Sequence, residues 1–172
     1  MPTAARSLLS TVTRTVSLLI VMLFMASLGN AHAQQGKRMN NTAIIERAFA
    51  AWAAGTGGPY DILADDLVWT ITGHSLASKT YNSREAFLGE VIRPFNARMS
   101  AGLRPTVHRI YQDGDTVIVY FDAAGTAKDG KPYVNTYAWV LTLRGGKIAR
   151  AVAFFDAVTF NDLWTRVSPA AK

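Results

Sequence analysis

A predicted strand carries four side chains able to hold a small molecule, and a carboxylate ends the strand that follows it. The four are Tyr133, Asn135, Tyr137 and Trp139. Because side chains alternate across a strand, residues spaced by two share one face. Hydroxyl and amide groups among large rings are typical of a pocket wall. Asp156 is then the candidate for proton transfer, because burial among rings would raise the pKa of its carboxyl toward a useful range.

Each of these polar side chains also has a purely structural interpretation. Asp156 could cap a following helix by accepting backbone N–H bonds. Tyr137 and Asn135 could orient a substrate oxygen through their donors, or satisfy each other inside a core. The sequence leaves these alternatives open, and Tyr137 stands beside Asp156 as a candidate catalytic residue.

Further candidates come from rings and a histidine elsewhere in the chain. Large rings are expected to line the pocket rather than to act chemically, and with the Asn135 amide the expected ligand-binding set is Trp52, Trp69, Tyr120, Asn135, Trp139 and Phe155. Tyr120 either joins this cavity or faces a dimer partner. His74 follows a predicted strand near the expected pocket mouth, where it could shuttle protons or be only an exposed polar residue.

Composition narrows the classes of chemistry. The chain has no cysteine, which removes disulfides, thiol chemistry and cysteine-based metal sites. His74 and His108, the two histidines beyond residue 33, are far apart and have no ligand-like spacing to a carboxylate, so no metal and no cofactor are expected. The basic residues are scattered, which does not favour nucleic-acid binding.

The N-terminus has the pattern of a secretory signal peptide. Arg6 and Arg14 precede an apolar run from Val16 to Leu28, and Ala31-His32-Ala33 forms a small-residue cleavage site before Gln34. A retained membrane anchor would need about 20 apolar residues, more than this run supplies. Cleavage would lower the net charge from +6 to +4, because two basic residues and no acidic residue are lost. We expect a periplasmic or secreted protein with no stable membrane anchor after cleavage.

The remaining chain is one domain's worth of residues with helices first and strands after. Helical spacing predicts a first helix from Asn40 or Asn41 to Gly55, and Asn82 with Glu85 suggests a capping box before a second helix that Pro94 kinks. Strands are predicted at 67–72, 106–111, 116–122, 133–143 and 148–156, with a short closing helix at 160–164. The predicted organisation is a signal peptide at 1–33, a lead at 34–40, a domain at 41–166 and a tail at 167–172. Such an order favours an α+β fold, with helices packed in the concavity of a curved, mainly antiparallel sheet.

This order resembles a SnoaL-like member of the NTF2-like superfamily, a cone-shaped fold that ketosteroid isomerases and polyketide cyclases share. The resemblance rests on Phe49 to Gly55, Ala64 to Trp69, Asp129 to Asn135, and Gly146 to Ile148 leading to Phe155-Asp156. It implies a deep, mostly apolar pocket, frequent homodimerisation, and an acid/base aspartate on a late strand, a place that Asp156 fits.

The departures from the family are equally informative. A gapless match puts Ile71 where steroid isomerases have their base aspartate, and Ala48 where they have a first-helix tyrosine. The arginine between two aspartates of epoxide hydrolases and the histidine of the cyclases have no clear counterpart. Steroid isomerisation is therefore not expected.

The functional expectation is an exported protein that binds a small, largely apolar molecule with a carbonyl or hydroxyl group. Acid/base chemistry of the isomerase, cyclase or lyase type through Asp156, without a cofactor, is one form of it. The alternative is a non-catalytic periplasmic ligand-binding, dimeric accessory or interaction protein. The sequence does not decide whether the protein is an enzyme.

Overall fold

The first helix covers residues 41–54 of the computed structural model, which describes residues 41–169. It ends at Gly55, whose φ of 76° lies in the left-handed region that favours glycine. Ile45 and Phe49 on one face of this helix are buried, as its spacing predicts. The predicted helix is confirmed, whereas the signal peptide at 1–33, the lead at 34–40 and the last three residues lie outside the described residues.

A short connection leads from this helix into the sheet. The 3-10 helix η1, Pro59–Ile62, begins with proline at a position where its missing N–H costs nothing, and Asp61 accepts a 2.7 Å hydrogen bond from Gly58 N. Strand β1 then spans Leu63–Ile71, four residues earlier than predicted, and the two-residue strand β2, Thr80–Tyr81, pairs with it.

The second helical segment is continuous from residue 84 to residue 96 but changes type along its length. It consists of α2, Arg84–Phe87, the π-helical η2, Leu88–Ile92, and α3, Arg93–Asn96. The predicted cap is wrong by one residue, since Ser83 accepts from Ala86 N at 3.1 Å. Pro94 has no N–H to donate to the preceding turn, and the segment departs from α geometry there by widening into a π turn.

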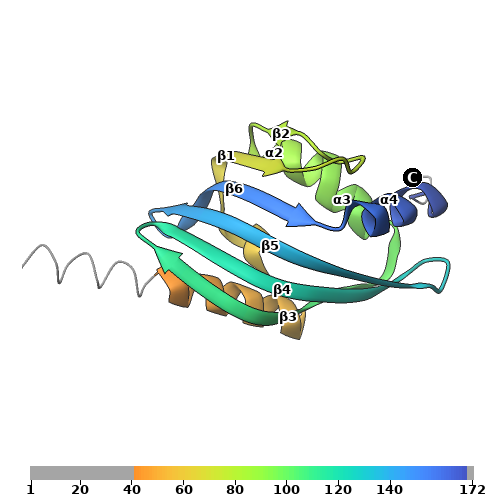
Figure 1. Cartoon of the computed structure of the whole chain (residues 1–172), viewed down its shortest axis with the longest axis horizontal. Coiled ribbons are helices and arrows are strands. Elements are labelled where there is room, and N and C mark those ends of the chain that lie inside the picture. Colours follow the sequence, from red (N-terminus) through yellow and green to blue (C-terminus); the bar gives the residue numbers. More distant parts are fainter. Residues whose placement is uncertain (1–40, 170–172) are drawn as a thin grey trace, which may run out of the picture. The chain divides into compact units, whose positions relative to one another are not determined.

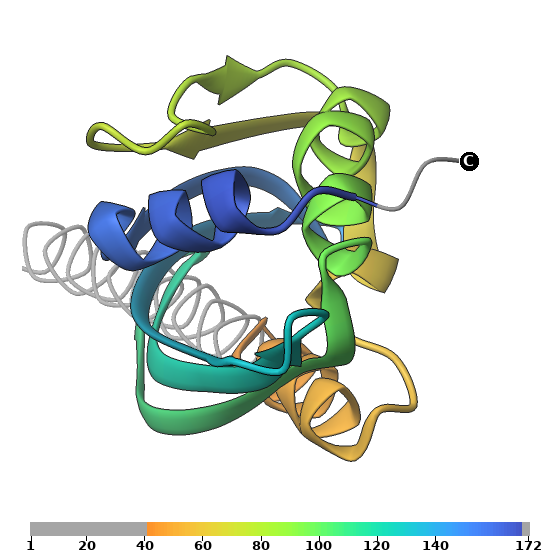
Figure 2. The ribbon, with the colours of Figure 1, turned by 90° about the vertical axis from the view of Figure 1, so that its right-hand side faces the viewer.

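Four long strands and a final helix complete the chain (Figure 1). They are β3, Met99–Asp113, β4, Thr116–Ala127, β5, Pro132–Arg144, β6, Lys147–Phe155, and α4, Ala157–Arg166. The sheet order is β2-β1-β6-β5-β4-β3, antiparallel at every pairing except β1 with β6. Figure 2 shows the sheet strongly curved, with the helical segment 84–96 and α4 opposite its concave side. The predicted α+β fold with a mainly antiparallel curved sheet is confirmed.

The inner face of the sheet carries the core. Along β5 the buried residues alternate strictly, so the predicted common face of Tyr133, Asn135, Tyr137 and Trp139 is confirmed. Phe49 of the first helix packs edge-on against two rings of this face, Phe121 at 4.9 Å and Trp139 at 5.7 Å between centroids.

Arg98 fastens the last helix to the end of the second helical segment. Its guanidinium stacks over the Trp164 ring at 4.1 Å and donates to the carbonyls of Pro94 at 2.9 Å and Trp164 at 3.4 Å. These carbonyls belong to the last turns of two helices, where a cation is favoured. Burial lowers the pKa of Arg98. Arg98 therefore joins α3 to α4, and these two helices border the site described next.

Candidate functional site

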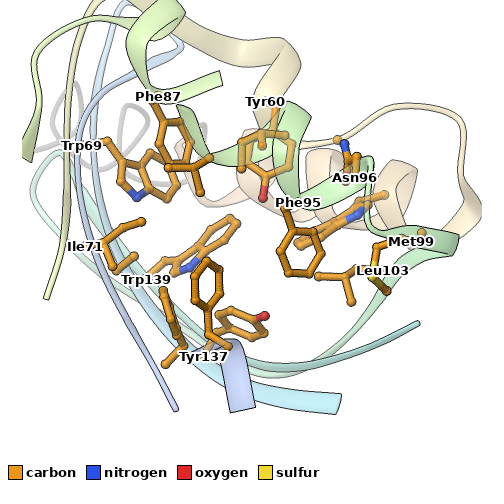
Figure 3. A pocket seen from close by; sticks show the side chains of 18 of the residues that line it. Tyr60, Trp69, Ile71, Phe87, Phe95, Asn96, Met99, Leu103, Tyr137 and Trp139 are labelled. Carbon is orange, nitrogen blue, oxygen red and sulfur yellow. The ribbon is translucent and has the colours of Figure 1, made fainter. Parts of the chain in front are cut away.

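A cavity of about 370 Å³ lies between the concave face of the sheet and the helices around it. Nine of the 21 residues that line it are aromatic (Figure 3): Trp52, Tyr60, Trp69, Phe87, Phe95, Tyr137, Trp139, Phe155 and Phe160. They come from the first helix, η1, the helical segment 84–96, three strands and α4. A wall assembled from so many elements encloses an apolar space large enough for a molecule of a few fused rings.

The rings brace one another, which makes the wall rigid. Trp69 is stacked on Phe87 with centroids 4.2 Å apart and planes at 12°. Trp139 is stacked on Trp52 at 14° and meets Trp69 edge-on at 87°. Offset stacks and edge contacts are the favourable aromatic geometries. The cavity is therefore preformed rather than created by a ligand.

One buried indole N–H in the wall lacks an acceptor. The Trp69 side chain is buried, and its Nε1 has no hydrogen-bond partner among residues 41–169. A buried donor without an acceptor costs about 1–3 kcal/mol. The hydroxyl of Tyr60 points into the space between the rings (Figure 3) and bonds no other described side chain. The Tyr60 hydroxyl is placed to bind an acceptor oxygen in the cavity, whereas Trp69 Nε1 is covered by its neighbours.

A chain of hydrogen bonds ends at a third donor, Tyr137. The Asn135 amide is paired twice with the peptide of Asp156: its Oδ1 accepts from Asp156 N at 3.0 Å, and its Nδ2 donates to Asp156 O at 3.0 Å. The second hydrogen of Nδ2 goes to the hydroxyl of Tyr133, also at 3.0 Å. The hydroxyls of Tyr133 and Tyr137 are 3.1 Å apart.

This chain fixes the orientation of the Asn135 amide. The two bonds to the Asp156 peptide settle which end of the amide is the carbonyl. The Tyr133 oxygen then receives an N–H, and either of the two phenol hydroxyls can donate to the other. When Tyr133 donates, the Tyr137 O–H is available to a ligand in the cavity whose wall Tyr137 joins.

The phenols around the cavity stay protonated. Burial is the main cause that raises the pKa of Tyr60, Tyr133 and Tyr137, and the charges that neighbouring groups would carry raise it further. Hydrogen bonds within the network lower the pKa of Tyr133 but do not reverse its shift. At neutral pH these groups are hydrogen-bond donors and not bases.

The expectation that Asp156 faces the cavity is wrong. Its side chain is exposed and caps α4, accepting from Val158 N at 2.8 Å and from Thr159 Oγ1 at 3.0 Å. The hydrogen bond from Val158 N is the main cause that lowers the pKa of this carboxyl. Ala153 and Phe155 of β6 line the cavity, so alternation places residue 156 on the outer side, and the strand ends there in a capping geometry.

Three further predicted site residues lie outside the cavity wall. His74 is exposed in the loop between β1 and β2. Tyr120 is 44% exposed on the outer face of β4, with its ring against His108. Asn135 is buried, but every polar group of its amide is used within the protein, so it supports the cavity from behind.

The other predicted residues do line the cavity: Trp52, Trp69, Tyr137, Trp139 and Phe155. Sequence reasoning missed Tyr60, which lies in a segment that the sequence predicts as a short turn or helix. It also missed Phe87 and Phe95, whose spacing predicts only that they share one face of the second helix. Helical spacing was the available signal for the two phenylalanines, but it does not separate a core from a cavity wall. Within residues 41–169, no group of three or more histidine or acidic side chains is arranged to hold a metal ion, and no helix is long and apolar enough to cross a membrane.

Comparison with known proteins places the chain in a family. Residues 45–151 match the model of the SnoaL-like domain. A search of curated proteins finds no match.

Solved structures share the fold. An NTF2-like protein from Burkholderia thailandensis has 23% identity and a TM-score of 0.59, covering 72% of this chain and 95% of its own. A protein with a ketosteroid isomerase-like fold from Catenulispora acidiphila, solved with trimethylamine, has 24% identity and a TM-score of 0.53, covering 67% and 88%. A candidate SnoaL-like polyketide cyclase from Jannaschia has 17% identity and a TM-score of 0.55, covering 72% and 93%. The fold is that of NTF2-like proteins, to which ketosteroid isomerases and polyketide cyclases are related.

Proposed function

The chain belongs to the SnoaL-like domain family, and we propose that it binds a flat, largely apolar molecule that carries an acceptor oxygen. The observation that carries this proposal is the Tyr60 hydroxyl, which points into an aromatic cavity and bonds no other described side chain. Tyr137 adds a second hydroxyl to the same wall. An aromatic ketone satisfies such donors, while a hydrocarbon of the same size leaves them unpaired.

Binding, and not proton transfer by a carboxylate, is the function that these groups support. Asp61 is the one carboxylate of the cavity wall within the described residues. It is exposed, and it accepts a hydrogen bond from Gly58 N. Protonated phenols and indoles polarise a carbonyl oxygen but do not abstract a proton. We therefore propose a ligand-binding protein whose donors orient the bound carbonyl.

A pair of matched probes tests this proposal. 2-Acetonaphthone carries one acceptor oxygen, and 2-ethylnaphthalene has nearly the same shape without it. Isothermal titration should give tighter binding of the ketone to the wild-type chain, and Tyr137→Phe should weaken the ketone about fivefold while leaving the hydrocarbon unchanged, since one hydrogen bond contributes about 1 kcal/mol. Tyr120→Phe, on the outer face, is the matched control. Equal affinity of the two probes for the wild type would overturn the proposal.

Export and homodimerisation complete the proposal. Export rests on residues 1–33, and mass determination of the protein from its native compartment should find an N-terminus at Gln34.

Homodimerisation is supported by large apolar side chains exposed on strands of the sheet, among them Tyr111, Tyr120 and Phe154. Light scattering of the purified protein should give twice the mass of one chain.

A further inference from the structure

The open side of the cavity has its own chemistry. Exposed residues of the wall mark this mouth, and they are Gly57, Asp61, Asn96, Gly102 and Arg104. A Cβ placed on Gly102 would meet nothing within 4 Å, so the approach is open there. The mouth thus joins an uncharged aromatic interior to two charged side chains, Asp61 and Arg104.

The Arg104 side chain lies beside the end of the first helix. Its guanidinium lies against Gly55, where a Cβ would stand 2.5 Å from Nη2 and 3.0 Å from Cζ. Gly55 ends the first helix, and the carbonyls at a helix C-terminus attract a cation. Among residues 41–169, the one hydrogen bond of this guanidinium is a 3.4 Å contact with its neighbour, Leu103 O.

No described carboxylate forms an ion pair with Arg104. Other arginines do have such partners: Arg144 pairs with Asp66, Arg93 with Glu85, and Arg166 with Asp129 and Asp162. Asp61 shares the mouth, but its Oδ2 accepts from Gly58 N at 2.7 Å, so this carboxylate is engaged by backbone. Arg104 therefore keeps guanidinium donors available at the edge of a cavity.

We infer that Arg104 selects ligands that carry a carboxylate at the end facing the mouth, beyond the acceptor oxygen that the interior donors hold. A guanidinium binds a carboxylate through two parallel N–H···O bonds, which fixes orientation as well as charge. The ligand class is an aromatic keto acid with the two oxygen groups at opposite ends. This inference rests on the proposed function, because the ring system must enter the cavity for its acid to reach Arg104.

A probe with both groups tests the inference separately from the proposed function. 6-Acetyl-2-naphthoate carries a ketone at one end and a carboxylate at the other, and its methyl ester lacks only the charge. Isothermal titration at low salt should show the acid binding the wild type three to ten times more tightly than the ester, a range reflecting the exposure of the mouth. In Arg104→Met the ratio should fall to about one, with the affinity for the ester unchanged.

Arg109→Met is the matched control, because it removes the same charge from the same strand away from the cavity. It should keep the wild-type preference for the acid. Equal binding of acid and ester to the wild type, with the ester still bound, would overturn the role of Arg104 and leave the proposed function standing. A ratio that falls equally in both variants would also overturn it, because overall charge would then explain the preference. Failure of both probes to bind while 2-acetonaphthone binds would overturn this inference alone, and failure of all three would remove the proposed function with it.

Discussion

Two polar clusters lie on opposite faces of the sheet and share strand β5, and they differ in burial, charge and exposure to water. The inner cluster, Tyr133, Asn135 and Tyr137, is buried and uncharged and joins the cavity wall. The outer cluster, His108, Asp122 and Thr136, is on the opposite face. There Asp122 accepts from Thr136 Oγ1 at 2.7 Å and lies 2.8 Å from His108 Nε2. The side chains of His108 and Asp122 are each at least about a third exposed to solvent.

The difference shows what burial does to a hydrogen-bond network. Thr136 is the sequence neighbour of both Asn135 and Tyr137, so one residue step decides which cluster a side chain joins. Inside, water cannot replace a lost partner, and each unpaired group is costly. Outside, water and salt compete with every bond. The inner cluster should therefore dominate stability and ligand binding.

Removal of the Asn135 amide should have the largest effect. Asn135→Leu removes three hydrogen bonds, one to the buried Tyr133 hydroxyl and two to the backbone N–H and carbonyl of Asp156, and we expect the free energy of unfolding to fall by about 2–4 kcal/mol. Thr136→Val, on the other face, should change it by less than about 0.5 kcal/mol. Urea denaturation of both variants measures the contrast. Similar losses would contradict the distinction between the clusters.

High pH should weaken the inner cluster alone. The pKa of Tyr137 is raised in the folded state, so its contribution to stability is complete below the unfolded-state pKa of about 10 and is lost as pH rises toward the folded-state pKa. Each such phenol should lower the unfolding free energy by about 1.4 kcal/mol per pH unit in that window. Tyr137→Phe should make the decline between pH 10 and 11 less steep in urea titrations. An unchanged slope would mean that Tyr137 is not protected by burial.

Low pH should act on the outer cluster, with a smaller effect. The hydrogen bond from Thr136 is the main cause that lowers the pKa of Asp122, followed by that from His108. A depressed pKa contributes stability above the unfolded-state value of about 3.9, and this is lost as pH falls through the folded-state pKa. The difference in thermal midpoint between wild type and Asp122→Asn should therefore shrink from pH 7 to pH 3. It should also shrink in 1 M salt at pH 7, because the group is exposed.

Asp156→Asn should have the smallest effect of the four. Asp156 joins the inner cluster through its peptide, whereas its carboxylate caps α4, and asparagine caps helices about as well. Affinity for 2-acetonaphthone should stay within about twofold of the wild type. Asp156→Ala, which cannot cap, should lower the thermal midpoint without changing that affinity. A tenfold loss of affinity in Asp156→Asn would show that the carboxylate does act on the ligand.

Much of the fold follows from local patterns. The first helix and the alternating face of β5 were predictable because apolar residues repeat every 3.6 positions in a helix and every two positions in a strand, and both repeats are visible in a short stretch of sequence. The ends of strands were less predictable. Strand β3 begins at Met99, well before the predicted residue 106, because its pairing with β4 extends through several register shifts. Among the cavity residues, the tryptophans and Tyr137 were predicted from their size and from strand alternation. Tyr60 was not, because it lies in the short helix η1, where no repeating pattern indicates which way a side chain points.

The sequence by itself determined which side chains share a face, since alternation and helical spacing are local geometry. It determined in the same way that rings, hydroxyls and amides would meet on the inner side of β5. Tertiary structure alone decided that Asp156 turns outward to cap α4, that Tyr60 enters the cavity from η1, and that Arg104 stands at the mouth against Gly55. The physical reason is that these placements depend on where elements end and which ones meet, and contacts between distant segments set both.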